Sequence, residues 1–321
     1  MFDVVARGFF HALAHSRLLK KLASRYGMAT PRSFARRFIA GEDIDEALAT
    51  CRAIQEQGML VTLDQLGESV TSLAEADTAT RDYLQLMERM ALAGADRNVS
   101  IKLTHLGLDV DRGISVDNVR RILEAAKRLD FFVRIDMENS PYVQPTLDLF
   151  DTIWQQEYRN AGVVLQSALY RSERDLEHVI VLGARVRLVK GTYKESRTVA
   201  YPKKADVDRA YARMLHRLLL EGNYPAIATH DVEMIAEAKR VAAEHHVERD
   251  RFEFQMLHGI RRDVQASLVS DGYRLRIYVP YGRDWFPYFM RRLGERPANV
   301  IFVARSLLAE RQFPLARPAR G

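Results

Sequence analysis

The chain alternates between two hydrophobic periods over most of its length. Short runs of β-branched and other apolar residues are separated by longer stretches in which apolar residues recur every three or four positions. Strands that alternate with helices in this way predict parallel βαβ units. The eight apolar runs are Met59–Leu63, Val99–Leu103, Phe131–Ile135, Val163–Leu165, Val186–Val189, Ala226–Ala228, Phe252–Gln255 and Leu275–Val279.

Eight such units in about 220 residues match an eight-stranded parallel barrel. Amphipathic stretches such as Val116–Leu129, Leu147–Tyr158 and Val207–Glu221 would supply its outer helices. A doubly wound sheet is the competing architecture, but it usually carries a glycine fingerprint after its first strand. This sequence has no G-x-G pair and no P-loop. The prediction is therefore a distorted (βα)8 barrel of the α/β class, TIM-like, over residues 57–311.

The segment before the barrel, residues 1–56, is predicted to be a helical arm, with Ser33–Ala40 and Ile44–Gln57 as its later helices. Between Val4 and Gly41 it carries several Lys and Arg residues and no acid. A basic amphipathic stretch fits a packed outer helix, a membrane-surface helix or a transit sequence. We favour packing with weak attraction to anionic lipid. Residues 312–321 are expected to form a flexible tail.

Composition narrows the class of protein. The 321 residues are 47% hydrophobic and 28% charged, as in a soluble globular protein, and no run approaches the roughly 18 apolar residues of a membrane span. A single cysteine, Cys51, excludes a disulfide framework and indicates a reducing, cytoplasmic compartment; we expect it to be buried in a helix. The net charge of +6 sits largely on the arm without interleaved aromatics, so nucleic acid is not an expected partner.

The stretch after the last strand predicts a helix that begins near residue 285. Asp284 can cap it, and Pro287 falls in its first turn. At about 100° per residue, one face is apolar and the other polar. The polar face could be a solvated surface or a two-arginine fork for a carboxylate or phosphate. The apolar face holds Phe286, Phe289, Met290 and Leu293, and the polar face holds Tyr288, Arg291, Arg292 and Glu295.

Polar residues follow every predicted strand, and in a parallel barrel the chemistry gathers at these carboxyl ends. A ring of this kind supports three interpretations. A divalent metal could be held by Asp136, Glu138 and His230. A Schiff base could form on Lys190 or Lys102. A large cofactor could be bound by Gln166, Arg187, Lys190, Thr229 and Gln255, and spacing alone favours this interpretation slightly. The strand-end residues are Asp64, Lys102, Thr104, His105, Arg134, Asp136, Glu138, Gln166, Arg187, Lys190, Thr229, His230, Gln255, His258 and Tyr278.

Four motifs, in this order along the chain, resemble the proline dehydrogenases, specifically the compact bacterial monofunctional type. They are Arg187-Leu-Val-Lys-Gly-Thr-Tyr193, Ala228-Thr-His230, Tyr278-Val-Pro-Tyr-Gly and Arg291-Arg-Leu-x-Glu295. The resemblance implies a distorted barrel with noncovalent FAD that oxidises L-proline to Δ1-pyrroline-5-carboxylate by hydride transfer to flavin N5. It also implies that electrons pass to membrane quinone, at the inner face of the cell membrane, and that a pyrroline-5-carboxylate dehydrogenase takes the product. The alternative is a metal- or Schiff-base-dependent (βα)8 lyase or aldolase.

The resemblance also implies roles for single residues. Arg291 and Arg292 would bind the proline carboxylate, held by Glu295, which favours the fork interpretation of the last helix. Asp136 would organise the pocket floor, and Arg187 would be a fixed cation beside the flavin. Lys102 would add positive charge at the carboxylate, and Tyr193 and Tyr278 would pack on the substrate ring. Cofactor contacts would come from Met137, Val164, Gln166, Arg187, Val189, Lys190, Gly191, Thr192, Thr229, His230, Gln255 and Leu257. Thr192 departs from the family, where alanine is common.

Overall fold

Eight parallel strands close into a barrel in chain order, as the sequence predicts. The computed structural model describes residues 34–295, with side chains from 35 to 290. The closure is made by β1, in which Leu63 pairs with Val99 of β2 on one side and with Val279 of β8 on the other. The strands are β1 (Leu60–Gln65), β2 (Asn98–Ile101), β3 (Phe132–Ile135), β4 (Ala161–Gln166), β5 (Arg185–Val189), β6 (Ala226–Ala228), β7 (Glu253–Leu257) and β8 (Leu275–Tyr281).

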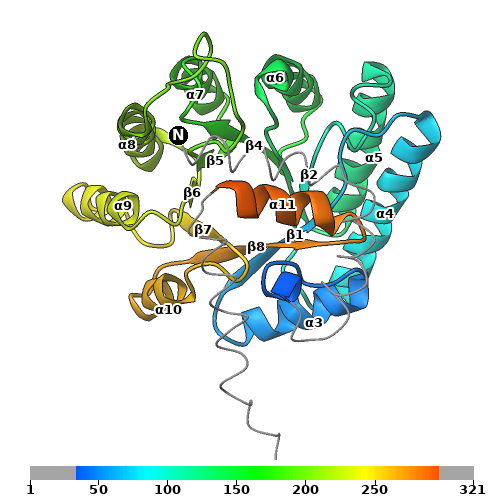
Figure 1. Ribbon diagram of the computed structural model, residues 1–321, viewed down its shortest axis with the longest axis horizontal. Helices are drawn as coiled ribbons and strands as arrows, with labels where there is room; N and C mark the ends of the chain where they lie inside the picture. The colour runs from blue at the N-terminus through cyan, green and yellow to red at the C-terminus, as the bar shows by residue number, and fades with distance from the viewer. Residues whose placement is uncertain (1–33, 296–321) are drawn as a thin grey trace, which may run out of the picture.

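Helices form an outer ring around the strands (Figure 1). Each of the first seven strands is followed by a helix that packs its apolar side on the sheet. The predicted helix Leu147–Tyr158 is longer than expected: it begins at Ser140, because Pro141 fits its first turn and Pro145 is tolerated further in. These helices are α4 (Leu73–Leu92), α5 (Arg112–Arg128), α6 (Ser140–Gln155), α7 (Ser172–Val181), α8 (Lys204–Glu221), α9 (Val232–Glu244) and α10 (Arg262–Ser270).

The helix before β1 takes the wall position that the helix after β8 holds in a regular barrel. This helix, α3 (Ile44–Gln55), is capped by Asp43, whose side chain accepts from the backbone N–H of Glu46. It packs on both β1 and β8, and Leu48, Cys51 and Ile54 enter the main core. Cys51 is therefore the buried helix residue that the sequence predicts. With the wall filled by α3, the last helix is free to lie elsewhere.

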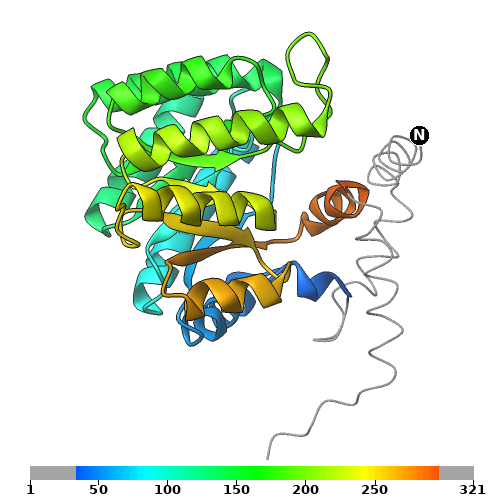
Figure 2. The same ribbon diagram turned by 90° about the vertical axis from the view of Figure 1, so that its left-hand side faces the viewer.

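That last helix, α11 (Trp285–Glu295), lies across one end of the barrel (Figures 1 and 2). The turn that joins it to β8 is short, so this end is the one where the strands finish. The helix begins where the sequence predicts. Its apolar residues form a second hydrophobic cluster, separate from the main core. This cluster contains Trp285, Phe286, Tyr288, Phe289 and Met290 with Ala35, Phe38, Ile39 and Leu66.

Two details of these end segments differ from the sequence prediction. The expected helix Ser33–Ala40 is only a short 3-10 turn, η1 (Phe34–Arg37), because the chain must bend there to bring Phe38 and Ile39 under α11. Tyr288, expected on the polar face of the helix, is buried in the cluster of apolar residues. The polar face of α11 faces the barrel mouth rather than solvent at this position. Arm residues 1–33 and the tail 312–321 lie outside the described part of the chain.

The barrel interior is polar. Along β1, Val61 and Leu63 point to the helices, so Thr62 and Asp64 point inward with the two-residue period of a strand. An inward contact spans the barrel, where the Nη2 of Arg187 on β5 donates to the Oγ of Ser100 on β2 at 3.1 Å. Within the described range no helix is long and apolar enough to cross a membrane. The interior therefore presents a column of buried polar groups that leads up to the mouth.

Candidate active site

A buried ion pair stands at the ends of the first two strands. The Nζ of Lys102 donates to both carboxylate oxygens of Asp64, at 2.8 and 2.9 Å, and lies 4.0 Å from an oxygen of Asp136. Burial disfavours the ammonium charge, but the carboxylates of Asp64 and Asp136 outweigh it and raise the pKa of Lys102. Lys102 therefore stays a cation at any ordinary pH.

Asp136 joins two further predicted residues. One of its oxygens accepts from the Nη1 of Arg187 at 2.6 Å, and the other accepts from the hydroxyl of Tyr278 at 2.8 Å. The guanidinium of Arg187 also lies over the Tyr278 ring, 5.3 Å from its centroid. Burial, reinforced by the negative charges of Asp136 and Asp64, raises the pKa of Tyr278 well above its usual value, so it remains a neutral donor. One carboxylate thus orients a cation and a phenol at the mouth.

Gly191 supplies a backbone turn just after β5. Its φ of +98° lies in the left-handed region that favours glycine, and a Cβ there would lie only 3.0 Å from the Oε1 of Gln166. Gln166 is itself held, because its Nε2 donates to the backbone carbonyl of Glu138 at 2.7 Å. The Gly191 backbone is thereby left uncovered by any side chain of its own.

Lys190 is held by two carboxylates. Its Nζ donates to Asp208 on α8 at 2.5 Å and to Asp231, the N-cap of α9, at 2.6 Å. Lys204 also pairs with both aspartates. The charge of Lys190 is therefore balanced within the protein, and its position is fixed between two helix starts.

The remaining predicted contacts lie on β6 and β7. The backbone N–H of Leu257 donates to the Nε2 of His230 at 2.9 Å, which makes that nitrogen an acceptor. The hydroxyl of Thr229 accepts from the N–H of Asp231. Gln255 lies inside the barrel beside Arg187, whose Nε donates to its Oε1 at 2.5 Å. These residues form one rim of the barrel mouth.

An apolar patch lies at the ends of β3, β4 and β5. Three of the four predicted apolar contacts, Met137, Val164 and Val189, belong to one cluster with Val143 and Leu169. On the loop after β5, Thr192 is exposed, and Tyr193 is half-buried and near enough to Lys102 to help raise its pKa. The patch and the polar rim lie on neighbouring strands.

A cavity of about 200 Å³ opens between the end of β1 and α11. Lys102 and Tyr288 line it, together with Leu66, Gly67, Glu68, Asp284 and Pro287. This volume suits a small molecule of the size of an amino acid. Tyr288 of α11 therefore faces the same cavity as Lys102.

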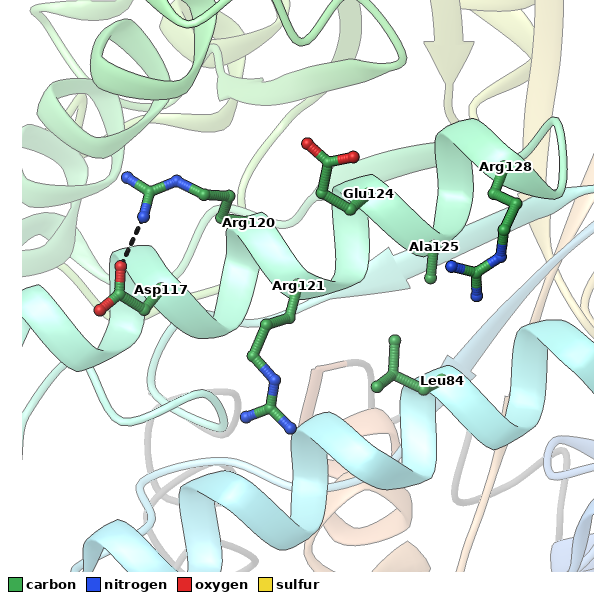
Figure 3. Close-up of a pocket in the computed structure, with 7 residues that line it drawn as sticks. All are labelled: Leu84, Asp117, Arg120, Arg121, Glu124, Ala125 and Arg128. Atoms are coloured by element: carbon green, nitrogen blue, oxygen red, sulfur yellow. Dashed lines mark hydrogen bonds and ion pairs between the residues drawn. The ribbon is translucent and has the colours of Figure 1, made fainter.

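A larger depression, of about 510 Å³, lies on the outer wall between α4 and α5 (Figure 3). It is lined by Leu84, Ala125, Arg128 and residues that already form ion pairs, such as Arg120 with Asp117. No strand end reaches it. The chemistry of the barrel therefore belongs to the smaller cavity.

Comparison with known proteins decides the family. The family model for proline dehydrogenase matches residues 47–305. The chain is 42% identical over 304 residues to proline dehydrogenase 2 of Bacillus subtilis (strain 168), covering 95% of this chain and 99% of that protein. It is 43% identical over 280 residues to proline dehydrogenase of Deinococcus radiodurans, covering 86% and 90% of the two chains. The chain belongs to the proline dehydrogenase family.

A solved structure of the same fold extends this relationship. Proline utilization A (PutA) from Bdellovibrio bacteriovorus, inactivated by N-propargylglycine, superposes with a TM-score of 0.77 at 28% identity. The match covers 91% of this chain and 35% of that one, so the chain spans about a third of the PutA protein. The predicted (βα)8 barrel and the predicted family are both confirmed.

Family membership and geometry together separate the three interpretations of the strand ends. Asp136, Glu138 and His230 do not converge: the side chain of Glu138 accepts from Thr104, and His230 faces Leu257. Among residues 35–290 no group of His, Cys, Asp or Glu could hold a metal ion. Both lysines are paired with carboxylates, which disfavours a nucleophilic amine. These contacts count against the metal and the Schiff-base interpretations of the strand ends.

Sequence reasoning gave no role to several residues of the polar network inside the barrel. Asp64 follows the first predicted strand, and its inward position follows from the two-residue period, but only the barrel brings Lys102 to it. Ser100 and Glu253 carry no signal beyond being polar residues inside apolar runs. A polar residue on the inward face of a buried strand is the sequence pattern by which Ser100 and Glu253 could have been identified. The side chains of Arg291, Arg292 and Glu295 lie beyond the described side chains, although α11 includes their positions.

Stability should depend on pH through His105, which is buried and close enough to Lys102 to feel its charge. Burial, with the charge of Lys102, lowers the pKa of His105 to about 4, and its Nδ1 has no hydrogen-bond partner among the described residues. The unfolded chain binds a proton at His105 at a higher pH than the folded protein does. The free energy of unfolding is therefore highest above pH 6.5 and decreases as the pH falls toward 4. Between pH 7 and 5 the loss should be about 2 kcal/mol. Urea unfolding of wild type and His105→Leu should show a shallower pH dependence for the variant; equal slopes would contradict the assignment.

Proposed function

We propose that this chain is an FAD-dependent proline dehydrogenase that oxidises L-proline to Δ1-pyrroline-5-carboxylate. The observation that carries the proposal is the network of Lys102, Asp136, Arg187 and Tyr278 at the mouth of a barrel of this family, beside a cavity of about 200 Å³. Fixed cations, a neutral phenol and a small cavity suit a compact anionic substrate.

The substrate carboxylate would be bound from α11. Tyr288 lines the cavity, and positions 291, 292 and 295 follow it on the same helical face at about 100° per residue. Arg291 and Arg292 would form a fork for the carboxylate, with Glu295 fixing that pair. Lys102 adds a permanent positive charge on the opposite wall. It serves as a binding group rather than a base, because its raised pKa keeps it protonated.

The ring of the substrate would be positioned by Tyr278 and Tyr193. Asp136 fixes the phenol of Tyr278 and the guanidinium of Arg187 at the same time, so the floor of the site is rigid before the substrate enters. The nitrogen of proline must be unprotonated when its neighbouring carbon gives up a hydride. A site with cations on two sides favours that neutral amine, since it raises the cost of a further positive charge.

The donor set fits FAD. A backbone turn without a Cβ at Gly191 lies beside the amide of Gln166, an apolar patch lies next to it, and Lys190 stands fixed nearby. When bound, FAD supplies the hydride acceptor, flavin N5, for the hydrogen on the carbon next to the proline nitrogen. Arg187 would present a fixed cation at the flavin edge. The residues that would hold the cofactor are Met137, Val164, Gln166, Arg187, Val189, Lys190, Gly191, Thr192, Thr229, His230, Gln255 and Leu257.

Purified protein should be yellow and should bleach when L-proline is added without oxygen. A soluble quinone should restore the colour, as expected of an enzyme that passes electrons to membrane quinone and its product to a pyrroline-5-carboxylate dehydrogenase. Absorption spectra between about 350 and 500 nm check both steps. Protein that binds no flavin would overturn the cofactor assignment, and borohydride trapping of a substrate adduct would favour a lyase instead.

Replacing either arginine of α11 should weaken substrate binding without loss of flavin. Arg291→Met or Arg292→Met removes one arm of the fork, which should cost roughly 2–4 kcal/mol of carboxylate binding. Steady-state kinetics should show the corresponding rise in the KM for proline, while the flavin content per chain is unchanged. Arg128→Met, on the outer wall, is the matched control. A wild-type KM in both α11 variants would mean that the pair faces solvent.

The basic arm is proposed to give weak peripheral attachment to the inner face of the cell membrane. Each basic residue near an anionic surface contributes about 1 kcal/mol at low salt. Deleting residues 1–25 should therefore reduce sedimentation of the protein with phosphatidylserine vesicles, and neutral phosphatidylcholine vesicles are the control. Unchanged sedimentation after the deletion would leave the arm with a packing role alone.

A further inference from the structure

Arg187 is held by three different side chains, one for each nitrogen of its guanidinium group. Its Nη1 donates to Asp136 at 2.6 Å, its Nη2 to Ser100 at 3.1 Å, and its Nε to the Oε1 of Gln255 at 2.5 Å. The plane of a guanidinium is set by its Nε contact together with one Nη contact. The Gln255 amide is thus one of the groups that decide how Arg187 is turned.

A second contact fixes the amide of Gln255. Its Nε2 donates to Glu253, two residues earlier on β7 and on the same inward face, at 2.5 Å. Glu253 is in turn anchored by Arg276, whose Nε donates to both of its oxygens at 2.9 and 3.1 Å. Arg276 completes the chain with a bond from its Nη1 to the carbonyl of Val61 on β1. A continuous series of hydrogen bonds therefore runs from the backbone of Val61, near the start of β1, to Arg187.

The contact between Arg187 and Gln255 crosses an intervening strand. Arg187 on β5 is in register with Ala226 on β6, and Ala226 is in register with Glu253 on β7; Ala228 is in register with Gln255. The inward positions of β6 beside this contact are thus alanines. Their methyl groups leave room for side chains from β5 and β7 to meet, which a larger residue would prevent.

We infer that Glu253 is a positioning residue for Arg187 and that it acts by fixing the orientation of the Gln255 amide. A carboxylate only accepts hydrogen bonds, whereas an amide presents a donor at one end and an acceptor at the other. Glu253 therefore attracts the Nε2 end of Gln255 and leaves the Oε1 end toward Arg187. If the amide were reversed, its NH2 group would face the Nε–H of Arg187, donor against donor. The functional part of this inference rests on the proposed role of Arg187 beside the flavin.

The test is an exchange of the two side chains. In Glu253→Gln the new amide can donate to Gln255, so the orientation of Gln255 is no longer enforced. In the double variant Glu253→Gln, Gln255→Glu, the carboxylate at position 255 accepts from Arg187 and from the new amide at position 253. The oxygen of that new amide can still accept from Arg276. The net charge of the double variant equals that of the wild type. Orientation is thus lost in the single variant and restored in the double variant.

Nitrogen-15 NMR of protein without flavin shows directly whether the Nε–H of Arg187 is held in its hydrogen bond. The signal is assigned by its loss in Arg187→Lys. The signal should be sharp and protected from hydrogen exchange in the wild type and the double variant, and exchange-broadened in Glu253→Gln. In flavin-loaded protein, kcat for proline should fall by up to about 100-fold in Glu253→Gln, with KM little changed, and recover in the double variant. Gln255→Met, which leaves the pair of Glu253 and Arg276 intact, should reproduce the loss if Glu253→Gln does not fold.

Asp175→Asn is the matched control, because it breaks a partly buried ion pair with Arg171 on the outer helix α7. It should lower stability without changing the Arg187 signal or kcat. The inference is overturned if the signal of Arg187 is unchanged in Glu253→Gln and Gln255→Met, or if the double variant is as impaired as the single one. Absence of proline oxidation in the wild type would overturn the proposed function instead, and the NMR comparison would still decide the role of Glu253.

Discussion

The site depends on one partly buried carboxylate, that of Asp136, and on the requirement that charges inside the barrel be paired. A charged group removed from water is costly unless another charge or a set of hydrogen bonds compensates it. Asp136 meets this requirement with Arg187 and Tyr278, and it also lies 4.0 Å from the ammonium group of Lys102. Groups from β2, β3, β5 and β8 are thus brought to one point. The same pairing that makes the interior stable gives the mouth its geometry.

The exchange of two helices places a cover over this mouth. In a regular barrel the helix after β8 covers the outer wall, and the mouth is formed by loops. Here α3 covers that wall, so α11 lies over the strand ends and is fixed by its own cluster with η1. Trp285 adds a hydrogen bond from its Nε1 to Glu42 at 2.8 Å. The α11 cluster is separate from the main core, so the cover over the cavity has hydrophobic contacts of its own.

The ion pairs of Lys102 and Lys190 also bear on the choice between a Schiff-base mechanism and the binding of anions, which the strand-end residues alone leave open. A Schiff-base lysine needs a neutral amine, which burial without a counterion provides. Lys102 lies against Asp64, and Lys190 lies between Asp208 and Asp231, so both ammonium groups are paired with carboxylates. Fixed cations bind and orient anions. The two lysines are therefore suited to electrostatic binding rather than to covalent catalysis by an amine.

The order of the strands, the barrel and the ring of polar strand ends could be predicted from the sequence, because hydrophobic period and punctuation are local properties of the chain. The start of α11 at Trp285 followed from Asp284 and Pro287 in the same way. Other features depend on contacts between distant segments. The pairing of Asp64 with Lys102, the burial of Tyr288 and the placement of α3 on β1 and β8 join residues that local pattern cannot relate. The sequence thus determined which residues stand at the mouth, and only the closed barrel decided which of them hold one another, since pairing is a matter of distance in space.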